Sequence, residues 1–275
     1  MNLALLQIAN VPNFNYLEQY LKTCQKQQVS LLCFPEYVFE PFFTSLKTLS
    51  SATLLSRANF KNLQMLGSLS AQYNINFLTP IIVNNEVLLQ HRVWGKLSNT
   101  KGLYKTIALI RGTEKIEFYL PQCLIGFEHW NERAFFDNKK ARSARLPLTF
   151  EQDALKIGVL SGFELHFDEI FIRIKKEAYD MLIVPCANTF DTHARWRSLC
   201  KMRAFLNSCA LLRINRVGNE LVDGSTWNFY GDSLYINAYG KIEDSLQEYE
   251  GLMIVHVSKS EITQARESWG FYKEF

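Results

Sequence analysis

Short apolar segments alternate with longer amphipathic segments along most of this chain, and this alternation limits its fold more than any other feature. Apolar runs predict strands at residues 3–8, 30–34, 76–82, 104–110, 155–160, 181–185, 210–215, 233–238 and 251–257. Several runs are apolar throughout, which indicates burial on both faces of a sheet. Apolar residues at helical spacing predict helices within 15–28, 59–73, 168–179 and 192–208. Strands that alternate with helices indicate an α/β fold.

The last part of the chain has fewer predicted helices. Its strands follow one another through turns at Asp223-Gly224 and Tyr239-Gly240, so we expect some antiparallel pairing in a mixed sheet. No linker rich in Pro, Gly or Ser and no clear tandem repeat divides the 275 residues. A chain of this length fits one large hydrophobic core, and we therefore expect a single domain over residues 1–275.

Charge and cysteine usage argue against several classes of protein. The net charge is +3, with dispersed Lys and Arg, so we expect no nucleic-acid binding. No apolar run approaches the ~20 residues that cross a bilayer, and the N-terminus lacks the pattern of a signal peptide. Six cysteines without CxxC or zinc-site spacing indicate reduced thiols. We expect a cytoplasmic protein without membrane contact, metal or other cofactor.

Two segments place reactive residue types at the ends of predicted strands. Glu36 follows the apolar run 30–34, and a carboxylate just past a buried strand is a frequent location for chemistry in α/β proteins. The second segment is the strand 155–160, a turn through Ser161-Gly162-Phe163-Glu164, and a helix. Asp168 and Glu169 stand in the first turn of that helix, where the helix dipole favours negative charge.

These segments form part of an ordered series that resembles the nitrilase superfamily, the carbon–nitrogen hydrolases. The resemblance extends from the first strand to Arg266 and also includes the segments 181–185, 196–207, 215–218 and 230–233. It implies a four-layer α-β-β-α sandwich that usually pairs into dimers through the helices near the nucleophile turn. It also implies a Glu–Lys–Cys triad. The Glu acts as general base, the Lys stabilises the oxyanion, and the Cys attacks an amide or nitrile carbon.

The family residues match this sequence only in part. Glu36 matches the base. The segment 119–124 fits the lysine motif, but Pro121 occupies the place of the lysine. Glu128 is the best match to a second glutamate of the family, with Glu132 a weaker one. Gly162 stands where the family has its cysteine, although the aromatic and acidic residues that follow are present. Glycine removes the nucleophile and permits the backbone angles that a sharp turn needs.

The resemblance also suggests which residues line the pocket. Without a lysine, its carboxylates would repel one another, so we expect at least one raised pKa or a bound cation. A deep pocket lined by Glu36, Glu128 and Glu164 would favour ligand binding. The residues expected to contact a ligand are Glu128, Phe163, Glu164, Cys186, Asn188 and Trp196.

Other residues are candidates to replace the missing groups. Ser161 precedes the vacant position, and a shift by one residue points its side chain to the opposite face of a strand. Cys186 follows the strand 181–185, and Cys123 lies in the altered lysine motif, so either could supply a thiol. Candidates to replace the missing lysine are Arg111, Lys115 and His129, which are near it in sequence. None of them has a distinctive spacing.

Three hypotheses for function follow. The first is a catalytically degenerate family member, a homo-oligomer that binds a small amide, amine or carboxylate or acts through partner proteins. The second is an active amidohydrolase whose relocated thiol, Cys186 or Cys123, lies within reach of Glu36. The third is a structural subunit of a larger assembly, which an empty and collapsed pocket would favour.

Overall fold

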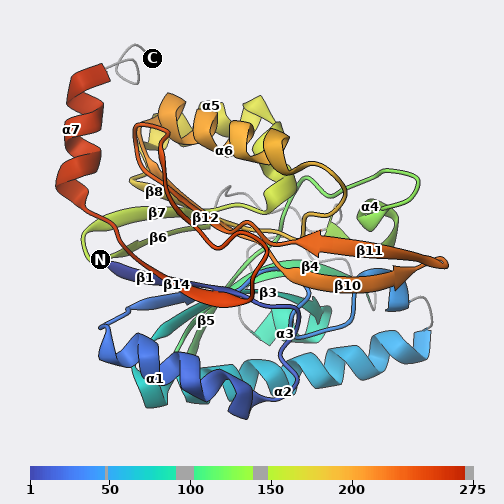
Figure 1. The fold of residues 1–275 in the computed structure, drawn as a ribbon. Helices are drawn as coiled ribbons and strands as arrows, with labels where there is room; N and C mark the ends of the chain where they lie inside the picture. The colour runs from blue at the N-terminus through green and yellow to red at the C-terminus, as the bar shows by residue number, and fades with distance from the viewer. Residues whose placement is uncertain (47–48, 91–101, 139–147, 270–275) are drawn as a thin grey trace.

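The computed structural model describes residues 1–46, 49–90, 102–138 and 148–269. Two six-stranded sheets lie face to face in this structure, and helices cover the outer face of each (Figure 1). This arrangement confirms the predicted α-β-β-α sandwich. Among the described residues, no helix combines the length and the apolar character that crossing a bilayer requires.

The first sheet has the strand order β14-β1-β2-β3-β4-β5. Its three middle strands β1, β2 and β3 are parallel, and the other pairs are antiparallel. The strands are β1 (Asn2–Gln7), β2 (Leu31–Cys33), β3 (Asn76–Asn84), β4 (Leu103–Arg111), β5 (Lys115–Tyr119) and β14 (Gly251–His256).

The second sheet has the order β13-β12-β9-β8-β7-β6, with β7, β8 and β9 parallel and the other pairs antiparallel. Reading it from β6 gives the same sequence of parallel and antiparallel pairings as reading the first sheet from β14. In this correspondence β2 matches β8, the middle strand of the other sheet. The strands are β6 (Leu148–Gln152), β7 (Leu155–Val159), β8 (Met181–Pro185), β9 (Ala210–Ile214), β12 (Leu234–Ile236) and β13 (Ile242–Ser245).

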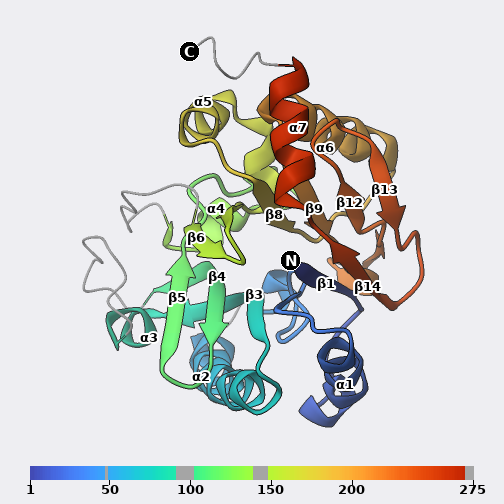
Figure 2. The same ribbon diagram turned by 90° about the vertical axis from the view of Figure 1, so that its left-hand side faces the viewer.

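Helices form the outer layers (Figures 1 and 2). The helices α1 (Glu18–Lys26) and α2 (Leu49–Tyr73) cover the first sheet, and α5 (Asp168–Glu177) and α6 (His193–Asn207) cover the second. The remaining helical elements are α3 (Asn85–Gln90), α4 (Glu132–Phe135), α7 (Lys259–Trp269), η1 (Phe14–Leu17), η2 (Phe43–Leu46) and η4 (Gly162–His166).

A separate hairpin joins β9 to β12. It consists of β10 (Val217–Val222) and β11 (Ser225–Tyr230), which pair antiparallel across the predicted Asp223-Gly224 turn. The second predicted turn, at Tyr239-Gly240, connects β12 to β13. The prediction of antiparallel strands late in the chain is therefore confirmed. In Figure 1 the hairpin lies at the opposite end of the molecule from α7.

Alternation along the strands explains the layers. In β8, Met181 and Ile183 pack between the two sheets, whereas Leu182 and Val184 pack against α5 and α6. A strand whose two faces are both buried must be apolar at every position, as this one is. The carboxyl ends of the middle strands β2 and β8 meet, because the amide of Glu36 donates to the carbonyl of Cys186 at 3.3 Å.

Candidate functional site

Charged side chains of both signs meet inside the molecule, close to the end of β2. The ammonium nitrogen of Lys105 lies 2.9 Å from Oε1 of Glu36 and 2.7 Å from Oε1 of Glu132. None of the three side chains is more than 6% exposed, so solvent screens these contacts little. We call Glu36, Lys105 and Glu132 the charged cluster.

The position of Lys105 on β4 directs its side chain into this cluster. Along β4, Ile107 packs between the two sheets and Ala108 packs on the helix side. Because side chains alternate in a strand, Lys105 shares the face of Ile107 and points between the sheets. Lys105 pairs with Ile82 of the antiparallel β3. The beginning of β4 therefore lies at the sheet edge where the parallel β2 and β3 end, close to Glu36.

Tyr37 holds the cluster together from the neighbouring position. Its hydroxyl donates a 2.7 Å hydrogen bond to Oε1 of Glu132, and its ring centroid lies 5.3 Å from the Lys105 nitrogen. The φ angle of Tyr37 is +60°, in the left-handed region. Such backbone costs a non-glycine residue on the order of 1–3 kcal/mol. The surrounding contacts must offset this cost, which is common at functional sites.

Burial sets the protonation of the cluster. It raises the pKa of Glu36 to about 7, although Lys105 acts in the opposite direction. Burial lowers the pKa of Lys105, but the carboxylates of Glu132 and Glu36 outweigh it and hold that pKa above its ordinary value. Lys105 is therefore charged at neutral pH, whereas Glu36 titrates near it. A carboxyl group that titrates there is suited to exchange a proton with a bound molecule.

The turn after β7 is organised around Glu164. Its carboxylate accepts hydrogen bonds from the amides of Ser161 at 2.9 Å and Gln122 at 2.8 Å, and from the hydroxyl of Tyr119 at 2.8 Å. Burial raises the pKa of Glu164, while these hydrogen bonds act against it. The carboxylate is thus used within the fold, where it fixes the turn. Burial, and not repulsion between carboxylates, is the largest cause of the raised pKa of both Glu36 and Glu164.

Gly162 begins η4, and the space available there requires a glycine. A β-carbon built on Gly162 would lie 2.6 Å from the β-carbon of Cys186, closer than real side chains approach. Gly162 is not among the glycines with positive φ, so the expectation of an unusual backbone angle is wrong. The side chain of Cys186 therefore fills the space that a residue-162 side chain would need.

The thiol of Cys186 is held in a buried and neutral state. Its sulfur lies 3.4 Å from the carbonyl oxygen of Ile214 and 3.6 Å from Oδ1 of Asn215, and it donates to these acceptors. Burial raises the pKa of this thiol to about 12, although the nearby Arg213 lowers it. At neutral pH the thiol therefore keeps its proton, and the thiol form is a poor nucleophile.

Asn188 and Trp196, two expected binding residues, contact the buried Arg213. The guanidinium of Arg213 donates to Oδ1 of Asn188 at 2.9 Å and to the carbonyl of Asp232 at 2.8 Å. The ring centroid of Trp196 lies 5.6 Å from the guanidinium carbon. Asp232 is also bound by two nitrogens of Arg197, at 3.0 and 2.6 Å. This network supports the segment next to Cys186 and gives both residues a role in the fold.

An aromatic cluster adjoins the charged cluster through Tyr37, which contacts Glu132 and Lys105. Two of its rings come from β11 of the hairpin, so this hairpin is tied to the site. The aromatic cluster consists of Tyr37, Phe42, Phe43, Trp130, Phe136, Trp227 and Phe229.

Buried hydrogen-bond donors without a partner lie in and next to the aromatic cluster. The guanidinium carbon of Arg216 is 4.5 Å from the ring centroid of Phe229, and its side chain is 3% exposed. One nitrogen of Arg216 binds Glu220 at 3.2 Å, but Nε and Nη1 have no partner in the described part of the chain. The indole nitrogen of Trp130 is likewise unpartnered. A buried donor left unsatisfied costs roughly 1–3 kcal/mol, which an acceptor on a bound ligand would recover.

The structure corrects the expectation that the pocket lacks a lysine. Pro121 lies one strand away from Lys105, and Asn138 joins the two positions. Its amide nitrogen donates to the carbonyl of Lys105 at 2.8 Å and to that of Pro121 at 3.0 Å. A proline supplies no cation at position 121, and the neighbouring strand β4 supplies one instead.

The expectation of a pocket lined by three glutamates is also wrong. Glu128 is exposed, whereas Glu132 is 1% exposed and belongs to the charged cluster. Asn131 caps α4 and thereby places Glu132 in its first turn. The ring of Phe163 packs against Phe127 at 5.9 Å and Phe167 at 5.3 Å, outside the charged cluster.

Cys123 lies beside a cavity that Glu36 does not line. It is half-buried and lines a cavity of about 140 Å³ together with Arg133, Phe136 and Phe167. Burial raises the pKa of its thiol to about 11. No group of three or more His, Cys, Asp and Glu that could hold a metal ion is found within the described ranges.

Lys105 was missed although the sequence carries a signal for it. It is the charged residue within the apolar run 104–110, which predicts a strand buried on both faces. A lysine at such a position is almost never buried unless it is paired. The same reasoning points to a buried carboxylate partner, here Glu36 and Glu132.

Comparisons with known proteins agree with this architecture. The model of the carbon–nitrogen hydrolase family matches residues 2–267. A deaminated glutathione amidase of Synechocystis is 23% identical over 278 residues, covering 96% of this chain and 94% of the relative. The solved carbon–nitrogen hydrolase of Helicobacter pylori G27 has a TM-score of 0.82 at 14% identity, covering 100% of this chain and 95% of that one.

A second relative covers less of the chain. An N-carbamoylputrescine amidase of Arabidopsis thaliana is 24% identical over 137 residues, which is 46% of each protein. With the sandwich fold, the positions of Glu36 and the turn at Gly162, and a family model that spans nearly every residue, the chain belongs to the carbon–nitrogen hydrolase family.

Proposed function

We propose that this chain is a non-hydrolytic member of the family that binds a small carboxylate or amide at the charged cluster. The observation that carries this proposal is the contact between positions 162 and 186. Gly162 has no side chain, and Cys186 fills the space that one would need. Loss of the nucleophile alone removes almost all activity of a catalytic triad.

The groups that remain are suited to hold a carbonyl or carboxylate oxygen. Lys105 is a buried ammonium, and Arg216 and Trp130 have donors without partners in the structure. Buried charges are costly to keep, and they often serve specificity or binding more than stability. The relatives named above are amidases, whose substrates carry a carbonyl next to nitrogen. A ligand of that class supplies the acceptors that this site lacks.

A binding and turnover screen tests the proposal. Small carboxylates, primary amides and N-carbamoyl amines are titrated into the native protein by calorimetry, and release of ammonia is followed in parallel. We expect at least one ligand that binds without turnover and whose affinity falls at least tenfold in Arg216→Gln. The exposed Arg173→Gln is the matched control and leaves the affinity unchanged. Ammonia release that Glu36→Gln abolishes would overturn the proposal.

A second candidate function is amide hydrolysis by Cys186. Its β-carbon lies 2.6 Å from the place that a residue-162 β-carbon would take, so the thiol stands close to the family's nucleophile position. Glu36 would accept the thiol proton as sulfur bonds to the carbonyl carbon, and that proton would leave with the amine as the C–N bond breaks. Water would then hydrolyse the thioester and restore the thiol. Turnover that is lost in Cys186→Ala and kept in Cys123→Ala would support this candidate.

We also propose that the chain forms a homo-oligomer through its outer helix layer. Large apolar side chains are exposed on α5 and α6, namely Ile172 at 58%, Met202 at 48% and Leu206 at 43%. Sedimentation of the native protein is expected to show a dimer or larger species, and Met202→Glu with Leu206→Glu is expected to shift it toward the monomer. A native monomer at micromolar concentration would contradict this.

The third hypothesis, a structural subunit, would be favoured by a different pair of results. These are a large assembly on sedimentation and no binding of any ligand in the screen.

A further inference from the structure

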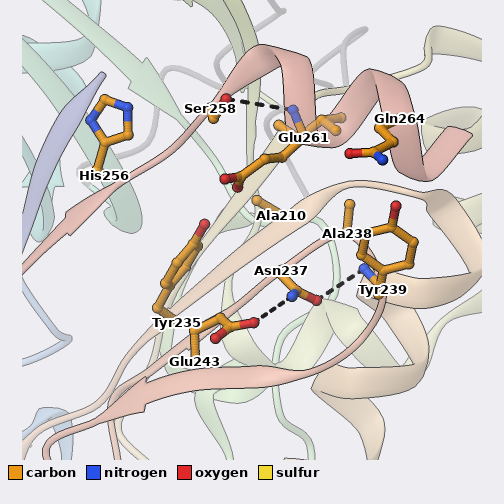
Figure 3. A pocket seen from close by; sticks show the side chains of 11 residues that line it. Ala210, Tyr235, Asn237, Ala238, Tyr239, Glu243, His256, Ser258, Glu261 and Gln264 are labelled. Atoms are coloured by element: carbon orange, nitrogen blue, oxygen red, sulfur yellow. Dashed lines mark hydrogen bonds between the residues drawn. The ribbon is translucent and has the colours of Figure 1, made fainter.

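A second concave site lies at the end of the molecule that carries α7. A cavity of about 400 Å³ opens between the β12–β13 turn, the end of β14 and α7 (Figure 3). This volume falls within the range of small-molecule sites, about 300–1,000 Å³. In Figure 1, α7 and the hairpin that contributes to the aromatic cluster lie at opposite ends, so this cavity is separate from the charged cluster.

Tyr235 forms one wall of the cavity and carries a free hydroxyl. The residue is 9% exposed and points into the cavity in Figure 3. Its hydroxyl has no hydrogen-bond partner among the described residues. Burial raises the pKa of Tyr235 to about 12, with Glu261 and Glu243 adding to the effect. The hydroxyl therefore stays neutral, and the two carboxylates stand near enough for their charge to act on it.

Among the described residues, the lining carries the carboxylates of Glu243 and Glu261 and the imidazole of His256, and it has no Lys or Arg side chain. Glu261 comes from α7, and its carboxylate makes no ion pair within the described residues. Glu243 comes from β13, where it accepts from Lys241 at 3.1 Å and from the amide of Asn237 at 2.5 Å. In Figure 3 the Tyr235 hydroxyl and the Glu261 carboxylate turn toward each other. The Glu261 carboxylate, without an ion-pair partner in the described part of the chain, lies beside a hydroxyl that opens to the cavity, so both can accept from a bound donor.

We propose that this cavity binds a small organic ammonium ion, with its N–H groups on Glu261 and the Tyr235 hydroxyl and its carbon chain against the Tyr235 ring. Aromatic faces attract cations, and carboxylates form their strongest hydrogen bonds with charged donors. A metal ion fits less well, because the described residues offer no group of three or more metal-ligating His, Cys, Asp or Glu.

Titration calorimetry tests this site with two probes at equal ionic strength, n-butylammonium chloride and sodium butyrate. The two probes have the same length and opposite charge. We expect saturable binding of n-butylammonium at this cavity, whereas any binding of butyrate, which belongs to the ligand class proposed for the charged cluster, is expected to be unaffected by Glu261→Gln. Glu261→Gln and Tyr235→Phe are each expected to weaken n-butylammonium at least fivefold. Glu267→Gln, on the same helix but outside the lining, is the matched control and leaves the affinity unchanged.

The same titration in Glu36→Gln separates this site from the charged cluster. The n-butylammonium affinity is expected to stay unchanged there, whatever the function of Glu36. A butyrate affinity that falls in Glu261→Gln, an unchanged n-butylammonium affinity in Glu261→Gln, or no saturable binding of n-butylammonium up to tens of millimolar would each overturn the proposal. If free amine does not bind but Glu261→Gln dissociates an oligomer on sedimentation, the cavity is an interface between copies, and the proposal is wrong.

Discussion

The two sheets contribute unequally to the site where β2 and β8 end. The first sheet supplies a charged half, in which Lys105 neutralises Glu36 and Glu132. The second sheet supplies the other half. There Gly162 has no side chain, and Cys186 fills the space beside it. On the motif alignment proposed for this chain, the cation is on β4 rather than at position 121, and a thiol stands after β8 rather than after β7.

This comparison shows which part of such a site tolerates relocation. An ammonium on a long flexible stem can reach its carboxylates from an adjacent strand, since the interaction depends mainly on distance. A nucleophile must also approach the reacting carbon in a defined direction, and its acidity must suit the reaction. In this structure the Cys186 thiol donates hydrogen bonds to the carbonyl of Ile214 and to Oδ1 of Asn215, and burial raises its pKa, so it keeps its proton at neutral pH.

The largest expected effect comes from removing the cation of the charged half. Lys105→Met leaves the carboxylates of Glu36 and Glu132 buried without a counter-charge, which typically costs about 3–5 kcal/mol. Urea unfolding at pH 7 measures the loss. Adding Glu132→Gln to Lys105→Met is expected to recover part of it. A loss below about 1 kcal/mol in Lys105→Met would show that the charged half is not a buried ion cluster.

The second effect is a pH dependence caused by Glu36. Its pKa is raised to about 7 in the folded protein and lies near ~4.3 in the unfolded chain. Between these values the folded state holds a proton that the unfolded state has lost. The free energy of unfolding therefore falls as the pH rises from about 4.5 to 7. Glu36→Gln is expected to remove this fall, on the order of 3 kcal/mol over the window.

Unfolding curves at half-unit steps of pH measure this slope. The exposed Glu18→Gln serves as the control, and its slope is expected to match that of the native protein. Parallel slopes for the native protein and Glu36→Gln would contradict the raised pKa. The charged half would then be ionised throughout this range.

The third effect tests the packing of the other half. Gly162→Ala places a β-carbon against that of Cys186, and such overpacking costs roughly 1–3 kcal/mol. Cys186→Gly alone leaves a cavity. The double variant exchanges the two volumes, so its loss is expected to be at least about 1 kcal/mol smaller than the sum of the single losses. Strict additivity in urea unfolding would show that the two positions do not compete for space.

The smallest effect belongs to an ion pair outside both halves. The side chains of Lys241 and Glu243 are 71% and 35% exposed and lie 3.1 Å apart. Exposed pairs contribute about 0–1 kcal/mol because water and salt screen them. Lys241→Met is therefore expected to change the free energy of unfolding by less than about 0.5 kcal/mol. If Lys241→Met lowered the free energy of unfolding as much as Lys105→Met does, burial would not explain why the two lysines differ.

The fold could be predicted because its signals are local. Apolar runs such as 181–185 lie on both faces of a sheet, and the turn residues at 223–224 and 239–240 mark the antiparallel strands. The less apolar strands β5, β6, β10, β11 and β13 were not predicted, since their exposed positions weaken the pattern. The helix α7 was missed for the same reason, as it buries only Ile262 and Ala265.

The site could be predicted in part. Glu36, Gly162 and Glu164 were located by motif, and all three lie at the sheet edge that the motif implies. Lys105 and the choice of Glu132 over Glu128 depend on strand pairing and on burial, which no local pattern expresses. The competition between Gly162 and Cys186 joins positions that are 24 residues apart. Such a contact is visible only once β7 and β8 are paired.

Intact-protein mass spectrometry after exposure to p-nitrophenyl acetate, with peptide mapping, tests the central claim most directly. If the second half lacks a working nucleophile, the native protein gains no acetyl group at Cys186. The double variant Gly162→Cys with Cys186→Gly, which returns a thiol to the turn, is expected to be acetylated at position 162. Rapid acetylation of Cys186 in the native protein, abolished by Glu36→Gln, would contradict the account and identify Cys186 as a nucleophile.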